Sequence, residues 1–317
     1  MNRGQVSSRP SRNAGLCRPR RLKEVKVMAQ KLTQDVLEKF KLERDPFVNE
    51  LRDADDVFMS KAHKKAEWLL TDAAQHQYFV ALVAPIGAGK TVILKRVMER
   101  LRKDGSVHVS RMQSVEKERA TAYGLCEALI RDFSAESPRR SREARARQLG
   151  AILEAMVRER KKPVLVIDEA HALNVPTLRA LKRLYDESEQ GFRRSIAILL
   201  IGQNSNADKG YNLDLKLGNW DLREVSERCQ VLRLGGLGNE VSAYLAWKFE
   251  RVGCRRELVT PEAVKLLTKT ADARKGEEIC PLFVNNLVAL ALTCAWELDK
   301  DTVTTDVMKD ALERARA

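Results

Sequence analysis

The chain has 317 residues, of which 44% are hydrophobic and 32% charged, with 16 Gly and 9 Pro. This composition excludes collagen-like, low-complexity and wholly disordered classes, and the length predicts two domains. No stretch reaches the roughly 18 uninterrupted apolar residues of a membrane helix, so we expect no membrane partner. The formal net charge of +13 favours an acidic partner such as nucleic acid.

Residues 1–30 carry eight Lys or Arg side chains and one acidic residue, Glu24. They lack the apolar segment of a secretory signal, so they are predicted to form a basic disordered tail. Such a tail either stays solvated, or precedes a start at Met28, or binds phosphates. The six cysteines lack the spacing of a zinc site, which favours reduced thiols in a cytoplasmic protein.

Helical periodicity alternates with apolar β-type runs as far as residue 236. Helices are expected at 32–40, 61–74, 120–133, 144–159 and 176–187, and strands at 78–83, 107–111, 163–168, 195–201 and 230–234. Beyond this region only helices are expected, at 240–251, 260–271, 282–298 and 305–315. The pattern predicts an α/β core with a parallel sheet over 31–236 and an all-helical domain over 237–317.

The strongest motif is the run Ala-Pro-Ile-Gly-Ala-Gly-Lys-Thr, which directly follows a predicted strand and precedes a helix. Backbone N–H groups of such a P-loop wrap a polyphosphate, the lysine reaches the β- and γ-phosphates, and the threonine joins Mg²⁺. The residues expected to bind ATP are Pro85, Ile86, Gly87, Ala88, Gly89, Lys90 and Thr91. Ala84 replaces the usual first glycine, but a strand end needs only ordinary backbone angles, so binding should survive.

A second predicted strand runs into Asp168 and Glu169. We expect Asp168 to hold Mg²⁺ with Thr91, and Glu169 to polarise the attacking water; the alternative is two helix-capping acids. These residues begin a helicase-like box, Asp-Glu-Ala-His, but the chain is too short for a second helicase core. His171 is therefore expected to support or pack rather than to catalyse.

A third strand ends near Gln203 and Asn204. A polar amide there would point at the γ-phosphate, between the carboxylates and the P-loop. Gln203 is the preferred candidate and Asn204 the second; an ordinary strand-ending turn is the alternative.

Together these residues resemble the AAA+ ATPases of the ExeA/TniB/TnsC type, which include phage Mu B-like transposition proteins. The resemblance runs from about Phe40 to the C-terminus. It is carried by Phe40 to Leu42, Asp45-Pro46-Phe47, Ser60-x-x-His63, the P-loop, Ile167 to Ala170, Ile201-Gly202-Gln203 and Glu227-Arg228-Cys229. It implies a five-stranded parallel AAA+ core, a helical lid, and rings or filaments with ATP at subunit boundaries.

The same resemblance assigns further residues. Phe47 would lie near the adenine, unless it simply packs into the core. Arg228 would complete the ATP site of a neighbouring subunit, with Arg223 as the second candidate and a surface ion pair as the alternative. Relatives often open a lid helix with Pro-Arg, whereas this chain has Pro281-Leu282, so hydrolysis is expected to be slow or dependent on assembly. Arg274 or Lys275 could replace the missing arginine.

Two basic clusters are candidate surfaces for duplex DNA. One consists of Arg111, Lys117 and Arg119, a region that faces DNA in TnsC-like relatives. The other consists of Arg139, Arg140 and Arg142, followed by Arg145 and Arg147. Such contacts reach phosphates and carry little sequence information, and either cluster could instead be a solvated helix face.

These observations predict a homo-oligomeric ATPase that assembles on duplex DNA, recruits or stimulates a transposase, and disassembles when ATP is hydrolysed. Two other functions stay open. One is an ExeA-like ATPase of secretion or envelope assembly, and the other is a replication-initiator-like AAA+ protein.

Overall fold

The computed structural model describes residues 31–48, 57–112, 117–190, 193–204, 212–272 and 279–315. Its centre is a five-stranded sheet in the order β2-β3-β6-β1-β7, with every pair of neighbours parallel. The strands are β1 (Phe79–Ala84), β2 (Val107–Arg111), β3 (Lys162–Ile167), β6 (Ala197–Gln203) and β7 (Gln230–Arg233). The expected parallel α/β core is therefore confirmed.

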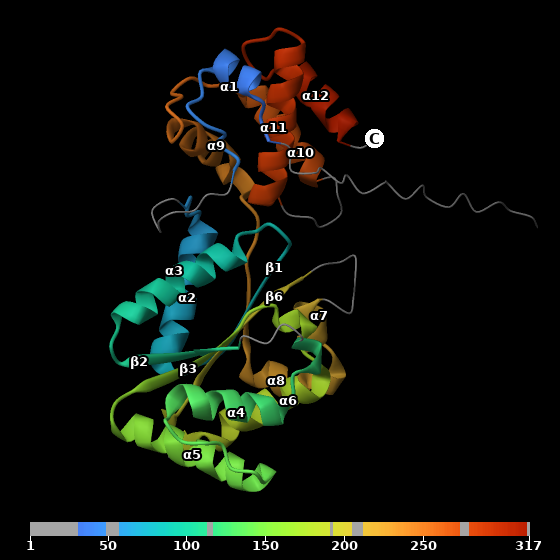
Figure 1. Cartoon of the computed structure of the whole chain (residues 1–317). Helices are drawn as coiled ribbons and strands as arrows, with labels where there is room; N and C mark the ends of the chain where they lie inside the picture. The colour runs from blue at the N-terminus through green and yellow to red at the C-terminus, as the bar shows by residue number, and fades with distance from the viewer. Residues whose placement is uncertain are drawn as a thin grey trace, which may run out of the picture.

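Helices cover both faces of the sheet (Figure 1). On one face, α2 (Lys61–His76) and α3 (Lys90–Lys103) pack against Val80, Leu82 and Ala84 of β1. The alternate residues Phe79, Ala81 and Val83 point to the other face. That face is covered by α4 (Ala122–Phe133), α5 (Arg142–Arg158) and α6 (Val175–Glu187). Burial on both sides explains why the central strands are continuously apolar.

Several short elements were not expected from the sequence. β4 (Glu189–Gln190) and β5 (Arg193–Arg194) form an antiparallel pair. The short helices are α7 (Leu213–Leu217), α8 (Arg223–Arg228), η2 (Lys117–Arg119), η3 (Ala170–Ala172), η5 (Trp220–Leu222) and η6 (Gly238–Glu240). Each is too short to show a helical or alternating pattern. In addition, α5 begins two residues earlier than expected, because Ser141 caps it by accepting a hydrogen bond from Ala144 N.

A separate hydrophobic cluster holds the C-terminal helices together. They are α9 (Val241–Glu250), α10 (Pro261–Asp272), α11 (Pro281–Glu297) and α12 (Thr305–Arg314). The expected all-helical domain is present, and α11 contributes buried residues along its whole length. Within the described part of the chain, no helix combines the length and apolarity needed to cross a membrane. The cysteines described there are all free thiols.

The first helix, α1 (Gln34–Phe40), packs with the C-terminal helices. Val36 and Phe40 are fully buried in the cluster of those helices, although the domain expected over residues 31–236 includes them. Figure 1 shows α1 beside α11 rather than on the sheet. The apolar side of α1 therefore packs in the cluster of the C-terminal helices, whereas α2 and α3 cover one face of the sheet. The basic tail, residues 1–30, lies outside the described residues.

Candidate nucleotide-binding site

The P-loop joins β1 to α3 and has the backbone geometry that phosphate binding requires. Gly87 and Gly89 have positive φ angles of 78° and 89°, in the left-handed region where glycine is favoured. Gly89 is the N-cap of α3, so the unpaired amides of the first helical turn lie beside the loop. Ala84 stays within the buried strand β1, which explains why this position needs no glycine.

Lys90 stands at the base of this loop. Its ammonium donates hydrogen bonds to Ala84 O at 2.9 Å and to Pro85 O at 2.8 Å. Burial lowers the pKa of Lys90, and the nearby Asp168 opposes that shift. Thr91, in the first turn of α3, lines the same cavity as Lys90. The loop thus places an ammonium, a hydroxyl and helix N-terminal amides together, and this set suits a polyphosphate with Mg²⁺.

The two acidic residues follow β3 at the same edge of the sheet. Asp168 accepts a hydrogen bond from Glu169 N at 2.9 Å. Glu169 has a φ of 54°, which is uncommon for a residue other than glycine and is often found at functional sites. The described residues contain no cluster of three or more Asp, Glu, His or Cys that could hold a metal alone. A Mg²⁺ site needs fewer protein ligands, because phosphate oxygens and water complete it.

Strand β6 brings Gln203 between the P-loop and the carboxylates. Its register pairs Leu200 with Ile167 of β3 on one side and Gln203 with Ala84 of β1 on the other. His171 is buried and its Nδ1 accepts a hydrogen bond from Gln203 N at 3.4 Å. Burial lowers the pKa of His171, so its ring supports this strand end as a neutral acceptor. The strand order therefore assembles the three motifs at one carboxyl edge.

A cavity of about 400 Å³ lies between the P-loop and the helical domain. Opposite Lys90 and Thr91 its wall is aromatic: the ring of Phe58 lies 5.4 Å from that of Tyr244 and 5.8 Å from that of Trp247. We did not single out these three rings from the sequence, where they are indistinguishable from ordinary core aromatics. Their place beside the P-loop suits a nucleotide base.

Phe47 does not line this cavity. Its ring packs edge-to-face on Phe249, 6.0 Å away, in the core of the helical domain. Phe47 thus packs into the core, which is the alternative to a place near the adenine. The carbonyl of the preceding residue, Pro46, accepts a hydrogen bond at 3.0 Å from Lys248, which lines the cavity.

Leu282 occupies the position at which relatives often have the lid arginine, and it packs directly on the P-loop. Its backbone N lies 3.4 Å from Gly87 O, and a Cβ added to Gly87 would be 2.4 Å from the Leu282 Cβ. The start of α11 therefore packs on the loop through an apolar side chain. Arg274 and Lys275, the suggested replacements, lie outside the described residues.

The two candidate arginines for a neighbouring site are paired within the chain. Arg228 Nε lies 3.2 Å from Asp186 Oδ1. Arg223 donates to Glu227 at 3.1 Å and its guanidinium lies 5.1 Å from the Trp220 ring centroid. Neither arginine lines the cavity described above. A role for Arg228 in a second copy stays a prediction.

The first basic cluster lies against the acidic pair. Arg111 Nη2 is 3.4 Å from Asp168 Oδ2, and Lys117 Nζ is 3.4 Å from Glu169 Oε2. Strands β2 and β3 are neighbours in the sheet, and Arg111 is paired with Val166, two residues before Asp168. This register explains why Arg111 reaches the acidic pair. Arg119 ends the short helix η2 and is exposed. Two of the three expected DNA contacts therefore face the nucleotide site.

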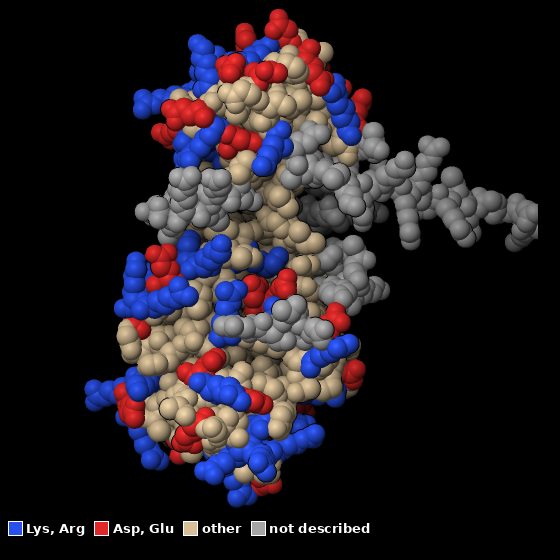
Figure 2. Space-filling model, viewed as in Figure 1, with Lys and Arg blue, Asp and Glu red and all other residues tan. Residues whose placement is uncertain are grey.

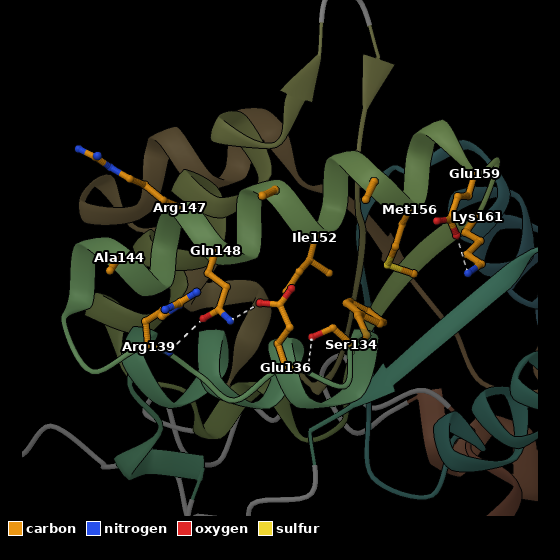
Figure 3. Close-up of a pocket in the computed structure, with 13 residues that line it drawn as sticks. Ser134, Glu136, Arg139, Ala144, Arg147, Gln148, Ile152, Met156, Glu159 and Lys161 are labelled. Atoms are coloured by element: carbon orange, nitrogen blue, oxygen red, sulfur yellow. Dashed lines mark hydrogen bonds and ion pairs between the residues drawn. The ribbon is translucent and has the colours of Figure 1, made fainter.

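The second basic cluster is only partly a free surface. Arg139, Arg140 and Arg142 are exposed near the start of α5, where Figure 2 shows Lys and Arg side chains gathered. Figure 3 shows the groove beside α5, of about 710 Å³, in which Gln148 accepts a hydrogen bond from Arg139 N at 3.0 Å. Arg145, by contrast, is buried.

The contacts of Arg145 are structural. Its guanidinium lies 3.6 Å from the ring centroid of Tyr123, and Nη2 donates to the Tyr123 hydroxyl at 2.6 Å. Its Nε donates to Arg139 O at 3.0 Å. Arg147 pairs with Glu143 in the same helix. Arg145 thus holds the loop that carries the exposed arginines and is not available to phosphates.

Comparison with known proteins agrees with this geometry. Residues 72–209 match a family described as an AAA domain. Among solved structures, the chain is similar to Cdc6p from Pyrobaculum aerophilum (14% identity, 85% of this chain and 70% of that chain, TM-score 0.53). It is also similar to a chain of Drosophila ORC bound to DNA (14% identity, 100% of this chain and 70% of that chain, TM-score 0.53).

At such low identities the likeness concerns the fold alone. No curated protein matches this sequence. The matched segment contains the P-loop, the acidic pair and Gln203, and the sheet has the strand order described above. Residues 72–209 therefore match an AAA domain, and the α/β fold, with its five-stranded parallel sheet and C-terminal helices, is similar to that of Cdc6p.

Proposed function

We propose that this protein is an ATP-dependent, DNA-binding regulator of DNA transposition that works as a homo-oligomer on duplex DNA. The observation that carries the proposal is the pairing of two basic residues with the two carboxylates of the nucleotide site. In these pairs, cations that could bind DNA phosphates contact the two carboxylates that would take part in ATP hydrolysis.

Each part of the site has a role in ATP hydrolysis. Residues 85–91 would wrap the phosphates, and Thr91 and Asp168 would hold Mg²⁺, which would supply charge neutralisation on the phosphates. Glu169 accepts a hydrogen bond from the attacking water and orients it. Gln203, between loop and carboxylates, donates its amide N–H to the γ-phosphate.

DNA would act on this site through Arg111 and Lys117. Their ion pairs with Asp168 and Glu169 are long and partly exposed, so each contributes no more than about 1 kcal/mol. Duplex phosphates offer a denser negative charge and draw the same cations away. The carboxylates are then released to Mg²⁺ and water, so DNA binding raises the rate of hydrolysis.

The finer parts of the proposal concern assembly and partner. Arg228 of one copy completes the site of the next, so hydrolysis is slow in dilute protein. A transposase is recruited by the assembled, ATP-bound form. Support for these parts comes from the resemblance of the motifs to those of TniB/TnsC-type ATPases.

The DNA-dependent step is tested by phosphate release from purified protein with and without random duplex, at low and moderate salt. We expect stimulation of several-fold that weakens as salt rises. Lys117→Ala should raise the basal rate by about two- to fivefold and reduce the stimulation, whereas Lys300→Ala, in the helical domain, is the control. Lys90→Ala should remove all activity. A rate indifferent to duplex in every variant would overturn the DNA role and favour the secretion ATPase.

The transposition role needs its own experiment. If a transposase is encoded beside this gene, its strand transfer should increase with this protein and ATP, and Lys90→Ala should not support the increase. If ATPase and DNA binding were intact but strand transfer never changed, transposition would be excluded and a DNA-dependent ATPase would remain.

A further inference from the structure

A buried histidine lies directly behind the P-loop. His63 is in the first turn of α2, only 3% exposed, and its Nε2 is 3.0 Å from Ala88 O. A Cβ added to Gly89 would lie 2.9 Å from the same nitrogen. The ring therefore fills the space behind the loop and leaves no room for a side chain at Gly89.

The hydrogen-bond partners define the tautomer of His63. A carbonyl oxygen can only accept, so Nε2 must carry the hydrogen that is donated to Ala88 O. Nδ1 lies 2.5 Å from Ser60 Oγ, and in the neutral ring it accepts the hydroxyl hydrogen. Burial lowers the pKa of His63 although Glu240 opposes the shift, which keeps the ring neutral near pH 7.

Ser60 and its surroundings hold the histidine in place. Ser60 is fully buried, and its Oγ also accepts a hydrogen bond from His63 N at 3.2 Å, which caps α2. The next amide, Lys61 N, lies 3.2 Å from a carboxylate oxygen of Glu240 at the start of the helical domain. Ser60 and Glu240 thus hold the first turn of α2 in place, and this turn carries His63 against the P-loop.

Fixing Ala88 O also fixes an amide of the phosphate cradle. In a trans peptide the carbonyl and the N–H of the following residue point in opposite directions. The peptide that joins Ala88 to Gly89 therefore directs Gly89 N–H away from His63, toward the opposite side of the loop. A P-loop binds phosphate through such amides, and glycine at 89 gives this peptide little stiffness of its own.

We propose that His63, oriented by Ser60, is a positioning residue that holds the Ala88–Gly89 peptide in the orientation that binds phosphate. This inference rests on the proposed ATP binding at the P-loop. We expect its effect to be confined to the phosphate part of the nucleotide, since two of the three rings suited to a base, Tyr244 and Trp247, lie on α9.

The test compares nucleotides that differ in phosphate content. His63→Leu removes the donor with little change of volume, His63→Gln keeps an N–H donor on a side chain of similar reach, and Ser60→Ala removes the group that orients the ring. His76→Leu, at the far end of the same helix and half exposed, is the matched control. Affinities for ATP, ADP and adenosine are measured by calorimetry, and the free energy of unfolding is measured without nucleotide.

We expect His63→Leu to weaken ATP and ADP binding tenfold to a hundredfold, as for loss of one buried hydrogen bond, with adenosine binding unchanged. His63→Gln should recover most of the loss, and Ser60→Ala should show an intermediate loss. The ¹⁵N spectrum of the wild-type ring should show hydrogen on Nε2 alone.

The outcomes separate this inference from the proposed function. If wild-type protein bound no ATP, the proposed function itself would fail. If wild type bound ATP and a folded His63→Leu bound it equally well, the positioning role would be wrong. Equal losses for ATP and adenosine would also overturn it, because they would indicate general damage. If His63→Leu does not fold, the nucleotide affinities of Ser60→Ala and the ¹⁵N spectrum of the wild-type ring test the proposal instead. Hydrogen on Nδ1 in that spectrum would refute it.

Discussion

Lys248 provides a quantitative test of how the helical domain meets the nucleotide cavity. Its ammonium donates a hydrogen bond to Pro46 O at 3.0 Å and lies 5.9 Å from the Trp247 ring centroid. Burial, reinforced by the positive charge of Arg251, lowers the pKa of Lys248 from its ordinary 10.5 to about 8, although Asp45 acts in the opposite direction.

The sign of the effect follows from proton binding. Between pH 8 and 10.5 the unfolded chain still holds the proton that the folded protein has lost, so the free energy of unfolding rises with pH across this window. Below pH 8 both states are protonated and the whole cost of burying the charge is present. At about 1.36 kcal/mol per pH unit, that cost is at most about 3 kcal/mol. Partial exposure and the hydrogen bond to Pro46 reduce it to roughly 1–2 kcal/mol.

The perturbation is Lys248→Met, which keeps most of the apolar stem and removes the amine. We expect the free energy of unfolding at pH 7 to rise by about 1–2 kcal/mol, and the difference from wild type to shrink as pH rises from 8 to 10.5. Urea unfolding followed by circular dichroism at pH 7 and 9.5 measures both. Lys265→Met, an exposed lysine of α10, is the control and should change little. If Lys248→Met were no more stable than wild type at pH 7, or if the difference did not vary with pH, the burial argument would be refuted.

Two further predictions concern the nucleotide site and α5. Glu169→Gln should bind ATP normally but release phosphate about a hundredfold more slowly, because its amide no longer acts as a base toward the attacking water; turnover near the wild-type rate would remove the role given to Glu169. Arg145→Met should lower the free energy of unfolding by roughly 2–3 kcal/mol, since it leaves the Tyr123 hydroxyl and a backbone carbonyl without their donor. The exposed Arg140→Ala should change it by less than about 0.5 kcal/mol, and urea unfolding curves that coincided for the two variants would contradict a structural role for Arg145.

Much of the fold could be predicted because its signals are local. The P-loop needs consecutive residues with particular backbone angles, and buried parallel strands need short apolar runs. The edge that assembles the site also follows, because parallel strands end together. Gln203 and Asp168 were assigned in this way, and the register of β6 with β1 and β3 places both beside the P-loop.

Other features of the site depend on residues that are far apart in the chain. His63 was noted only as part of a shared motif, and its contact with Ala88 spans 25 positions. Arg111 and Lys117 were assigned to DNA alone, although they reach Asp168 and Glu169 across more than 50 positions. No periodicity in a single sequence encodes such pairs.

The same reason explains the misplaced elements. A short apolar face, such as that of α1, shows that a helix will be buried but not which cluster will bury it. Arg145 has the same one-dimensional signature as its exposed neighbours, and only the position of Tyr123 on α4 makes it a buried residue. Local chemistry thus specified the elements and the nucleotide motif. Packing between distant segments determined which charges stay free, because burial is a property of all the neighbours that a residue meets in the folded chain.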